Sequence, residues 1–199
     1  MFNRLVDFKP GTTEVIPALA KDLPEISADG LTYTFHLRDD IKFHTPSSMP
    51  YTMAVFYESL RLFPPIPFEI RQCTGQSVTL PDGTFLPKDS VLVWCLWAMH
   101  RSKLTWGDDA EVFNPGRFLQ KDEEGGVKLI QRSASEFPVF YGGPRTCLGK
   151  KMAEGIAVQV IPAMVWEFDF EGTSVGERRS KSSLTMPMEG GLPVLVGGR

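Results

Sequence analysis

The sequence predicts an α+β fold that divides into two unequal parts near residue 47. Short alternating segments with turn residues precede this point, and two stretches with apolar residues at helical spacing follow it. The chain of 199 residues is 42% hydrophobic and contains 14 Phe and 4 Trp. This composition is sufficient for a packed core in one domain of good size or in two small ones.

The first part, residues 1–47, is expected to form short β-strands joined by turns. Asp29 and Gly30 form a turn signal, and residues 31–44 alternate between apolar and polar side chains on both sides of Asp39 and Asp40. Residues 45–50, TPSSMP, have the composition of a loop. We therefore expect β structure up to this loop and a different pattern beyond it.

The second part, residues 48–199, is expected to begin with a helix and to continue with short strands. The helix starts near Tyr51 and stops at Pro64 and Pro65. Its spacing predicts one apolar face, formed by Met53, Phe56, Leu60 and Phe63. Short strands are expected around the turn at Asp82 and Gly83, and the apolar run over residues 90–99 predicts a buried strand.

A second long helix is expected near the end of the chain. Residues 101–136 are rich in loops, with a solvated turn over residues 121–126. The helix should run from about Lys150 to Phe168, and Pro162 is a possible point of kinking. The tail over residues 183–198 is strand-like, with Gly-Gly at its turn.

Charge and cysteine content argue against several classes of protein. The net charge of −3 predicts no nucleic-acid partner. The three cysteines contain no Cys-x-x-Cys pair, which argues against a disulfide framework or zinc ribbon and favours a reducing compartment. No secretory signal and no membrane anchor are expected, because the longest apolar run has about half of the roughly 20 residues that a membrane helix needs.

The strongest chemical signal lies in residues 140–149, FYGGPRTCLG. Cys147 precedes the predicted second helix, where the helix dipole and free N–H groups favour a thiolate, a strong ligand for haem iron. Gly149 lets a flat cofactor approach the backbone, and Arg145 can pair with a haem propionate. A lone cysteine is ordinarily structural. The five positions of F-x-x-G-x-R-x-C-x-G, however, match by chance in well under about 1 in 1,000 chains.

This loop resembles the haem-binding loop of the cytochrome P-450 family, the haem-thiolate monooxygenases, and two further motifs agree in the family's order. Glu58 and Arg61 form an E-x-x-R on one helix face, which resembles the family's helix K. Residues 113–118, FNPGRF, resemble its P-E-R-F signature, with Gly116 where the family often has Glu. For an isolated E-x-x-R, the ordinary alternative is a surface ion pair.

The resemblance covers about residues 47–199 and implies the C-terminal part of the P-450 fold, which is mainly α-helical when complete. That part comprises helix K, short strands, a meander, the cysteine loop, helix L and a terminal hairpin. The resemblance implies haem b with Cys147 as its iron ligand, and further haem contacts from Phe140, Gly143, Arg145, Gly149 and Arg71. It also implies a buried salt-bridged triad that braces the haem loop, formed by Glu58, Arg61 and Arg117.

The three histidines of the chain are the other possible iron ligands. His36, His44 and His100 are expected to be solvated or structural rather than ligands.

The resemblance implies oxidation of a hydrophobic substrate such as a fatty acid, because residues 100–118 resemble members that hydroxylate fatty acids. Electrons would come from NADPH through a reductase, at the cytoplasmic face of the endoplasmic reticulum if the full-length protein is eukaryotic.

The distal half of a haem site is not expected in this chain. The family's acidic-Thr motif for oxygen activation has no counterpart in the sequence, and neither do the segments upstream of helix K. We therefore expect the proximal half of a haem site without a water-excluding cavity. No catalytic residue is assigned, and coupled monooxygenation by this chain alone is not expected.

Residues 3–44 resemble an N-terminal part of the family 5 extracytoplasmic solute-binding proteins, which bind dipeptides and oligopeptides. Residues 3–21 and 29–44 carry this resemblance. Some 45 residues are too few to build a two-lobed cleft. The combination predicts a chimera or a fragment, with two alternatives to the haem-thiolate function: a piece of a periplasmic peptide-binding transport protein, or an inactive fusion.

Overall fold

Two small hairpins form the first part of the chain in a computed structural model, which describes residues 5–41, 45–173, 179–181 and 183–199. Strand β1 (Val6–Phe8) pairs antiparallel with β2 (Val15–Pro17), and β3 (Glu25–Ile26) pairs with β4 (Tyr33–Thr34). The turn expected at Asp29 and Gly30 is confirmed, and Gly30 has a φ of +71°, which glycine adopts without strain.

The β structure expected on both sides of Asp39 and Asp40, within residues 31–44, is confirmed only in part. Only Tyr33–Thr34 is a strand, and residues 42–44 lie outside the described residues. Leu31 is 84% exposed and Tyr33 is also exposed, so none of the described residues forms a second layer over the apolar side of this segment. A two-stranded hairpin without a covering layer buries little apolar surface when it becomes longer. It therefore gains little stability, because apolar burial is the main stabilising term.

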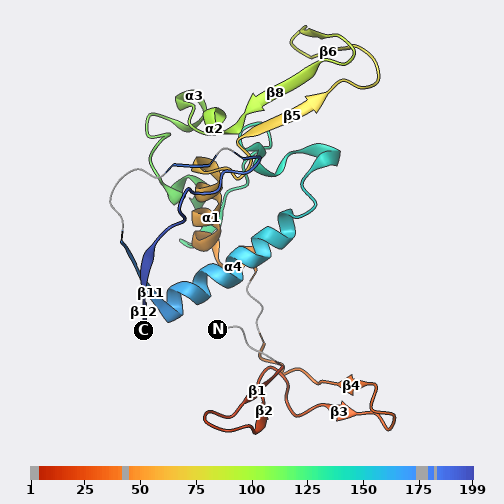
Figure 1. Cartoon of the computed structure of the whole chain (residues 1–199), viewed down its shortest axis with the longest axis vertical. Helices are drawn as coiled ribbons and strands as arrows, with labels where there is room; N and C mark the ends of the chain where they lie inside the picture. Colours follow the sequence, from red (N-terminus) through yellow and green to blue (C-terminus); the bar gives the residue numbers. More distant parts are fainter. Residues whose placement is uncertain (1–4, 42–44, 174–178, 182) are drawn as a thin grey trace.

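Helix α1 (Pro50–Leu62) lies at the centre of the second part (Figure 1), as the helical spacing predicts. Pro50 occupies the first helical position, where the missing N–H costs nothing. The buried core around the helix comprises Met53, Ala54, Tyr57, Trp106, Ala110, Phe118 and Val158. Helix α4 (Lys150–Glu167) packs against α1, which confirms the second predicted helix, and Pro162 lies inside it.

The predicted apolar face of α1 is partly wrong. Phe56 and Leu60 do pack against the core, but Phe63 is 61% exposed. The buried face instead includes Tyr57, Glu58 and Arg61. The apolar periodicity of the sequence does not predict this face. Two of its residues are charged, and they become buried only because they pair with each other.

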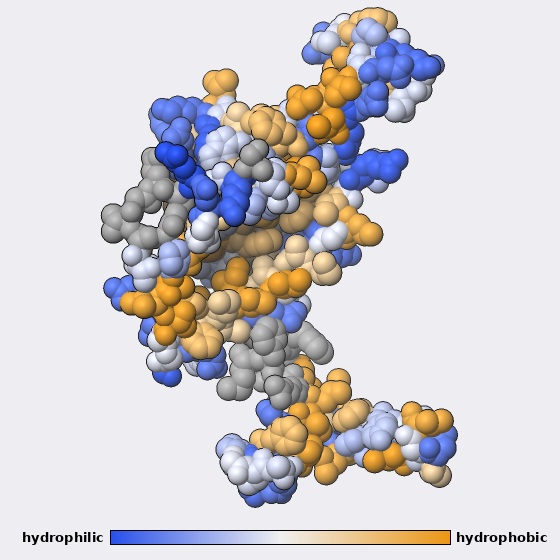
Figure 2. Space-filling view, in the orientation of Figure 1, coloured by the Kyte–Doolittle hydropathy of each residue, from blue (hydrophilic) through white to orange (hydrophobic). Residues whose placement is uncertain are grey.

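A β-ribbon extends from the core and ends at the opposite end of the molecule from β1–β4 (Figure 1). Strand β5 (Phe68–Gln72) pairs antiparallel with β8 (Val91–Cys95), and β6 (Val78–Thr79) pairs with β7 (Phe85–Leu86) beyond them. The strand expected over residues 90–99 is confirmed over Val91–Cys95. Its expected burial is wrong, because Val91 and Val93 are exposed, and residues 96–99 form helix α2 (Leu96–Met99) instead. Figure 2 shows apolar surface on this ribbon.

The loop-rich segment after α2 lies against α1 and leads to the end of the chain. It contains α3 (Lys103–Trp106), η2 (Pro115–Phe118), and the hairpin of β9 (Leu119–Lys121) and β10 (Val127–Leu129). The turns η3 (Pro138–Phe140) and η4 (Gly143–Arg145) precede α4, and a further turn, η1 (Pro46–Ser48), precedes α1.

Strand β11 (Phe168–Gly172) pairs with β12 (Val194–Gly198), so the strand expected in the tail is confined to its last residues. None of the described helices is long and apolar enough to cross a membrane.

Candidate functional site

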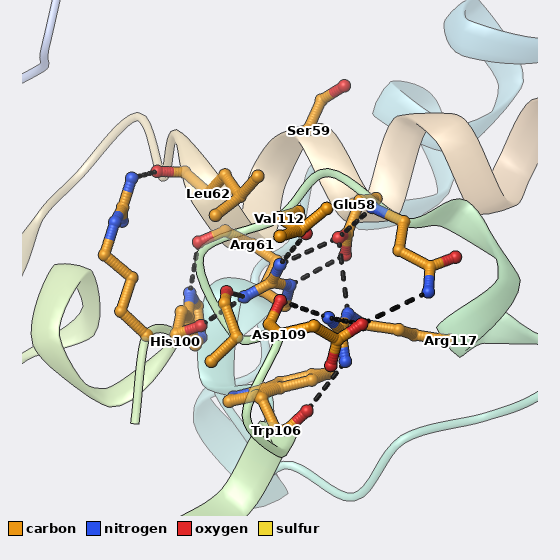
Figure 3. Close-up of polar contacts among 12 residues, drawn as sticks. Glu58, Ser59, Arg61, Leu62, His100, Trp106, Asp109, Val112 and Arg117 are labelled. Carbon is orange, nitrogen blue, oxygen red and sulfur yellow. Dashed lines mark hydrogen bonds and ion pairs between the residues drawn. The ribbon is translucent and has the colours of Figure 1, made fainter. Parts of the chain in front are cut away.

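A buried ion pair on α1 forms the centre of the polar network in Figure 3. The side chains of Glu58 and Arg61 are both 0% exposed. Nε of Arg61 lies 2.7 Å from Oε2 of Glu58, and Nη2 of Arg61 lies 2.7 Å from Oε1. The spacing of three residues places both side chains on one helix face, and the two parallel contacts form the strong bidentate geometry of an arginine–carboxylate pair.

Arg117 of η2 joins this pair from the opposite side. Its Nε lies 3.5 Å from Oε1 of Glu58, and its side chain is 9% exposed. The remaining guanidinium nitrogens donate to the carbonyls of Trp106 and Asp109 and contact the Asp109 carboxylate. The hydrogen bond from Arg117 holds the pKa of Asp109 below its ordinary value. The structure thus brings together all three residues of the triad that the sequence motifs indicate.

The triad also binds the backbone of the segment that follows α2. Nη1 of Arg61 donates to the carbonyls of His100 and Ala110, and Nη2 donates to the carbonyl of Val112 at 3.1 Å. The backbone N–H of Asn114 donates to Oε1 of Glu58 at 2.7 Å. Sequence reasoning missed these partners, because any residue type can supply a backbone carbonyl or N–H. The network therefore fixes residues 100–117 against α1.

His100 has a structural place in this network. It is buried, its Nδ1 lies 3.1 Å from the carbonyl oxygen of Arg61, and its ring centroid lies 5.1 Å from that of Phe137. Burial lowers the pKa of His100 to about 4, so the ring is neutral at pH 7. His36 is exposed beside Glu25, as expected for a solvated side chain, and His44 lies outside the described residues.

Cys147 lies in an exposed turn between η4 and α4. Its thiol is exposed, and its backbone N–H donates to the carbonyl of Phe140 at 2.8 Å, which closes the base of the loop. Gly143 has a φ of +64°, in the left-handed region that favours glycine. A Cβ placed on Gly149 would lie 3.8 Å from Sγ of Cys147, so the Gly149 backbone borders the sulfur directly.

An open hollow of about 680 Å³ lies beside this loop. Its lining includes Gly143 and Arg145 of the loop, together with Arg71 and Trp94 from the β5–β8 ribbon and Tyr141. Nη1 of Arg71 donates to the hydroxyl of Tyr141 at 3.1 Å, and its guanidinium carbon lies 4.0 Å from the Tyr141 ring centroid. Phe140 instead lies half-buried against the core. Two arginines from distant parts of the chain therefore meet at one hollow.

These residues fit a flat, apolar cofactor that carries carboxylates and an iron. The exposed thiol of Cys147 is available as a ligand, and the two arginines at the hollow suit carboxylates. Leu148 and Met152 both follow Cys147 along the chain and are exposed, so they offer apolar surface that a flat ring could cover. The hollow has the size of a typical ligand site.

Comparisons with known proteins agree with this arrangement. A family model described as Cytochrome P450 matches residues 33–192. Cytochrome P450 94A1 of Vicia sativa is 38% identical over 154 residues, which are 76% of this chain and 30% of that relative. Cytochrome P450 94B1 of Arabidopsis thaliana is 33% identical over 153 residues, with the same two shares. A cytochrome P450 of Helianthus annuus is 33% identical over 149 residues, which are 75% of this chain and 92% of that relative.

The extent of these matches defines what part of the family fold is present. The chain spans about 30% of the length of the Vicia and Arabidopsis relatives. The family match begins at residue 33, within the segment that resembles solute-binding proteins, and the boundary near residue 47 stays a prediction. Helix α1 with its buried E-x-x-R, the cysteine loop and α4 all lie inside the matched range. The chain belongs to the cytochrome P450 family and covers part of that fold, with mixed helices and short strands.

Proposed function

We propose that this chain binds haem through Cys147 and forms the proximal half of the active site of a monooxygenase. The observation that carries the proposal is the exposed Cys147 thiol, in a loop closed at its base by Phe140, beside a hollow that Arg71 and Arg145 both line. When bound, a haem with a thiolate ligand supplies the chemistry that activates dioxygen.

The chain's own residues hold and orient the cofactor in this proposal. The Cys147 thiolate binds the iron, and the guanidinium groups of Arg71 and Arg145 pair with the carboxylates. Gly143 and Gly149 keep the backbone of the loop close to the ring. Glu58, Arg61 and Arg117 do no chemistry; they hold residues 100–117 against α1 and so support the surface on which the loop lies.

The substrate and the electron donor belong to the whole protein rather than to this chain. We propose a hydrophobic substrate such as a fatty acid, on the resemblance of residues 100–118 to members that hydroxylate fatty acids. Electrons would come from NADPH through a reductase, at the cytoplasmic face of the endoplasmic reticulum in a eukaryotic cell. The chain alone should give little hydroxylated product per NADPH consumed, because its sequence has no counterpart of the family's acidic-Thr motif and the hollow beside the loop, among the described residues, is open.

Haem reconstitution tests the proposal. The reduced protein under carbon monoxide should show the red-shifted Soret band of a thiolate-ligated haem. Cys147→Ser should abolish this band, whereas Cys73→Ser and Cys95→Ser, which change the two half-buried cysteines, should keep it. An unchanged band in Cys147→Ser would rule out the assignment. Failure of all four proteins to bind haem would favour the inactive fusion, and peptide binding measured by calorimetry would favour the transport-protein fragment.

A further inference from the structure

One part-buried hydrogen bond joins α1 to α4 and is separate from the triad. The hydroxyl of Tyr57 donates to Oε1 of Glu154, across 97 positions of the sequence. Tyr57 directly precedes Glu58 on α1 and is almost fully buried. Its ring centroid lies 5.6 Å from that of Phe118 and 5.9 Å from that of Phe137, so the aromatic core holds the hydroxyl in one place.

Glu154 lies near the start of α4, where the helix follows the Cys147 loop. Its side chain is 13% exposed, and its Oε1 lies 3.8 Å from Nζ of Lys150, the first residue of the helix. A hydrogen bond from a phenol to a carboxylate is stronger than one between neutral groups, and more so where water is largely excluded. Burial and the bond to Glu154 both raise the pKa of Tyr57, so the phenol stays protonated and remains a donor.

The backbone N–H and the carbonyl of Cys147 are both hydrogen-bonded, and one of the two partners, Lys150, also contacts Glu154. The N–H of Lys150 donates to the carbonyl of Cys147 at 3.2 Å, and the N–H of Cys147 donates to the carbonyl of Phe140 at 2.8 Å. Nζ of Lys150 lies 6.0 Å from the ring centroid of Phe140. A continuous series of contacts therefore runs from the core of α1 through Tyr57, Glu154 and Lys150 to the residue that carries the thiol.

We infer that Tyr57 and Glu154 are positioning residues for Cys147. Their hydrogen bond fixes the first turns of α4 against α1 and so sets where the Cys147 thiol lies relative to the hollow. This inference rests on the proposed function, in which that thiol is the iron ligand. It adds a second connection between core and loop, independent of the ion pairs of Glu58.

Amide exchange and the haem spectrum together test this inference. In the full chain without haem, Tyr57→Phe and Glu154→Ala should each raise the hydrogen-exchange rate of the Cys147 amide by about tenfold. In the haem-loaded chain, the same variants should lower the share of the carbon monoxide complex that shows the thiolate band. Glu154→Gln keeps an acceptor oxygen for the Tyr57 hydroxyl and should restore both values to those of the unchanged protein.

Matched variants separate positioning from general stability. Tyr51→Phe removes the hydroxyl of a tyrosine on the same helix that is 65% exposed, and should change neither readout. The double variant Tyr57→Phe/Glu154→Ala should be no worse than either single variant, because both remove one shared bond.

Two results would overturn the inference, and a third bears only on the proposed function. Unchanged exchange and an unchanged thiolate band in Tyr57→Phe, with a lowered melting temperature, would make the pair purely structural. Additive losses in the double variant would mean that the two residues act separately. If the unchanged protein shows no thiolate band, the proposed function fails, while the exchange rates still decide whether Tyr57 and Glu154 fix the loop.

Discussion

The hairpins of residues 5–41 and the region around α1 differ in what covers their side chains. Strands β1–β4 have no buried residue, whereas α1 has Met53 and Ala54 at 0% exposure and even buries two charged side chains. Both regions contain ion pairs, but Lys9 and Glu14 meet in solvent, and Glu58 and Arg61 meet in the core. The contribution of an ion pair to the free energy of unfolding therefore depends on how completely the surrounding residues bury it.

The largest expected effect comes from breaking the buried ion pair. Glu58→Ala should leave Arg61 buried and unpaired and should lower the free energy of unfolding by about 3–5 kcal/mol. Urea denaturation followed by circular dichroism measures this loss. The matched control is Glu14→Ala, which breaks the exposed pair with Lys9 and should leave the transition almost unchanged. Equal midpoints for the two variants would contradict the difference between the regions.

Truncating an apolar side chain should also destabilise the α1 region much more than the hairpins. Met53→Ala removes a fully buried side chain from α1 and should cost about 2–5 kcal/mol, because a cavity remains. Leu31→Ala removes a side chain that already lies in solvent and should change little. Thermal unfolding of both variants gives the comparison, and a marked loss in Leu31→Ala would show that the hairpins have a core of their own.

Acid should destabilise the α1 region through His100. Unfolded histidine takes up its proton near pH 6.5, whereas His100 in the folded chain does so only near pH 4. The unfolded state therefore binds more protons in this window, and stability should fall by about 3 kcal/mol as the pH drops from 6.5 to 4. Denaturation midpoints at several pH values measure the fall. It should shrink in His100→Gln and persist in His36→Gln, which changes the exposed histidine.

The smallest expected effect comes from removing the hairpins altogether. A chain that starts at residue 45 keeps the core residues of α1, the triad and the cysteine loop. Its melting temperature and its haem affinity should match those of the full chain, because β1–β4 bury almost nothing of their own. Calorimetry and a haem titration test this expectation, and a large loss of haem affinity would mean that the hairpins cover the site.

Much of the local structure could be predicted from residue patterns. These local signals are the prolines at the start and end of α1, the Asp-Gly turns and the helical spacing after Gly149. Each depends only on neighbours a few residues away, so it has the same effect in any tertiary fold. The motifs around Glu58, Arg117 and Cys147 were also visible, since each needs particular side chains at fixed short spacings.

Burial and the contacts between residues far apart in the sequence were decided only by the tertiary structure. Whether Val91 and Val93 are buried depends on a second layer over the β5–β8 ribbon, and they are exposed. Arg61 is satisfied by carbonyls some 40 to 50 positions away, and Tyr57 meets Glu154 across 97. Such contacts use backbone groups or pairs of common side chains with no characteristic spacing. Only the folded path of the chain brings them within hydrogen-bonding distance, and only burial there makes them strong.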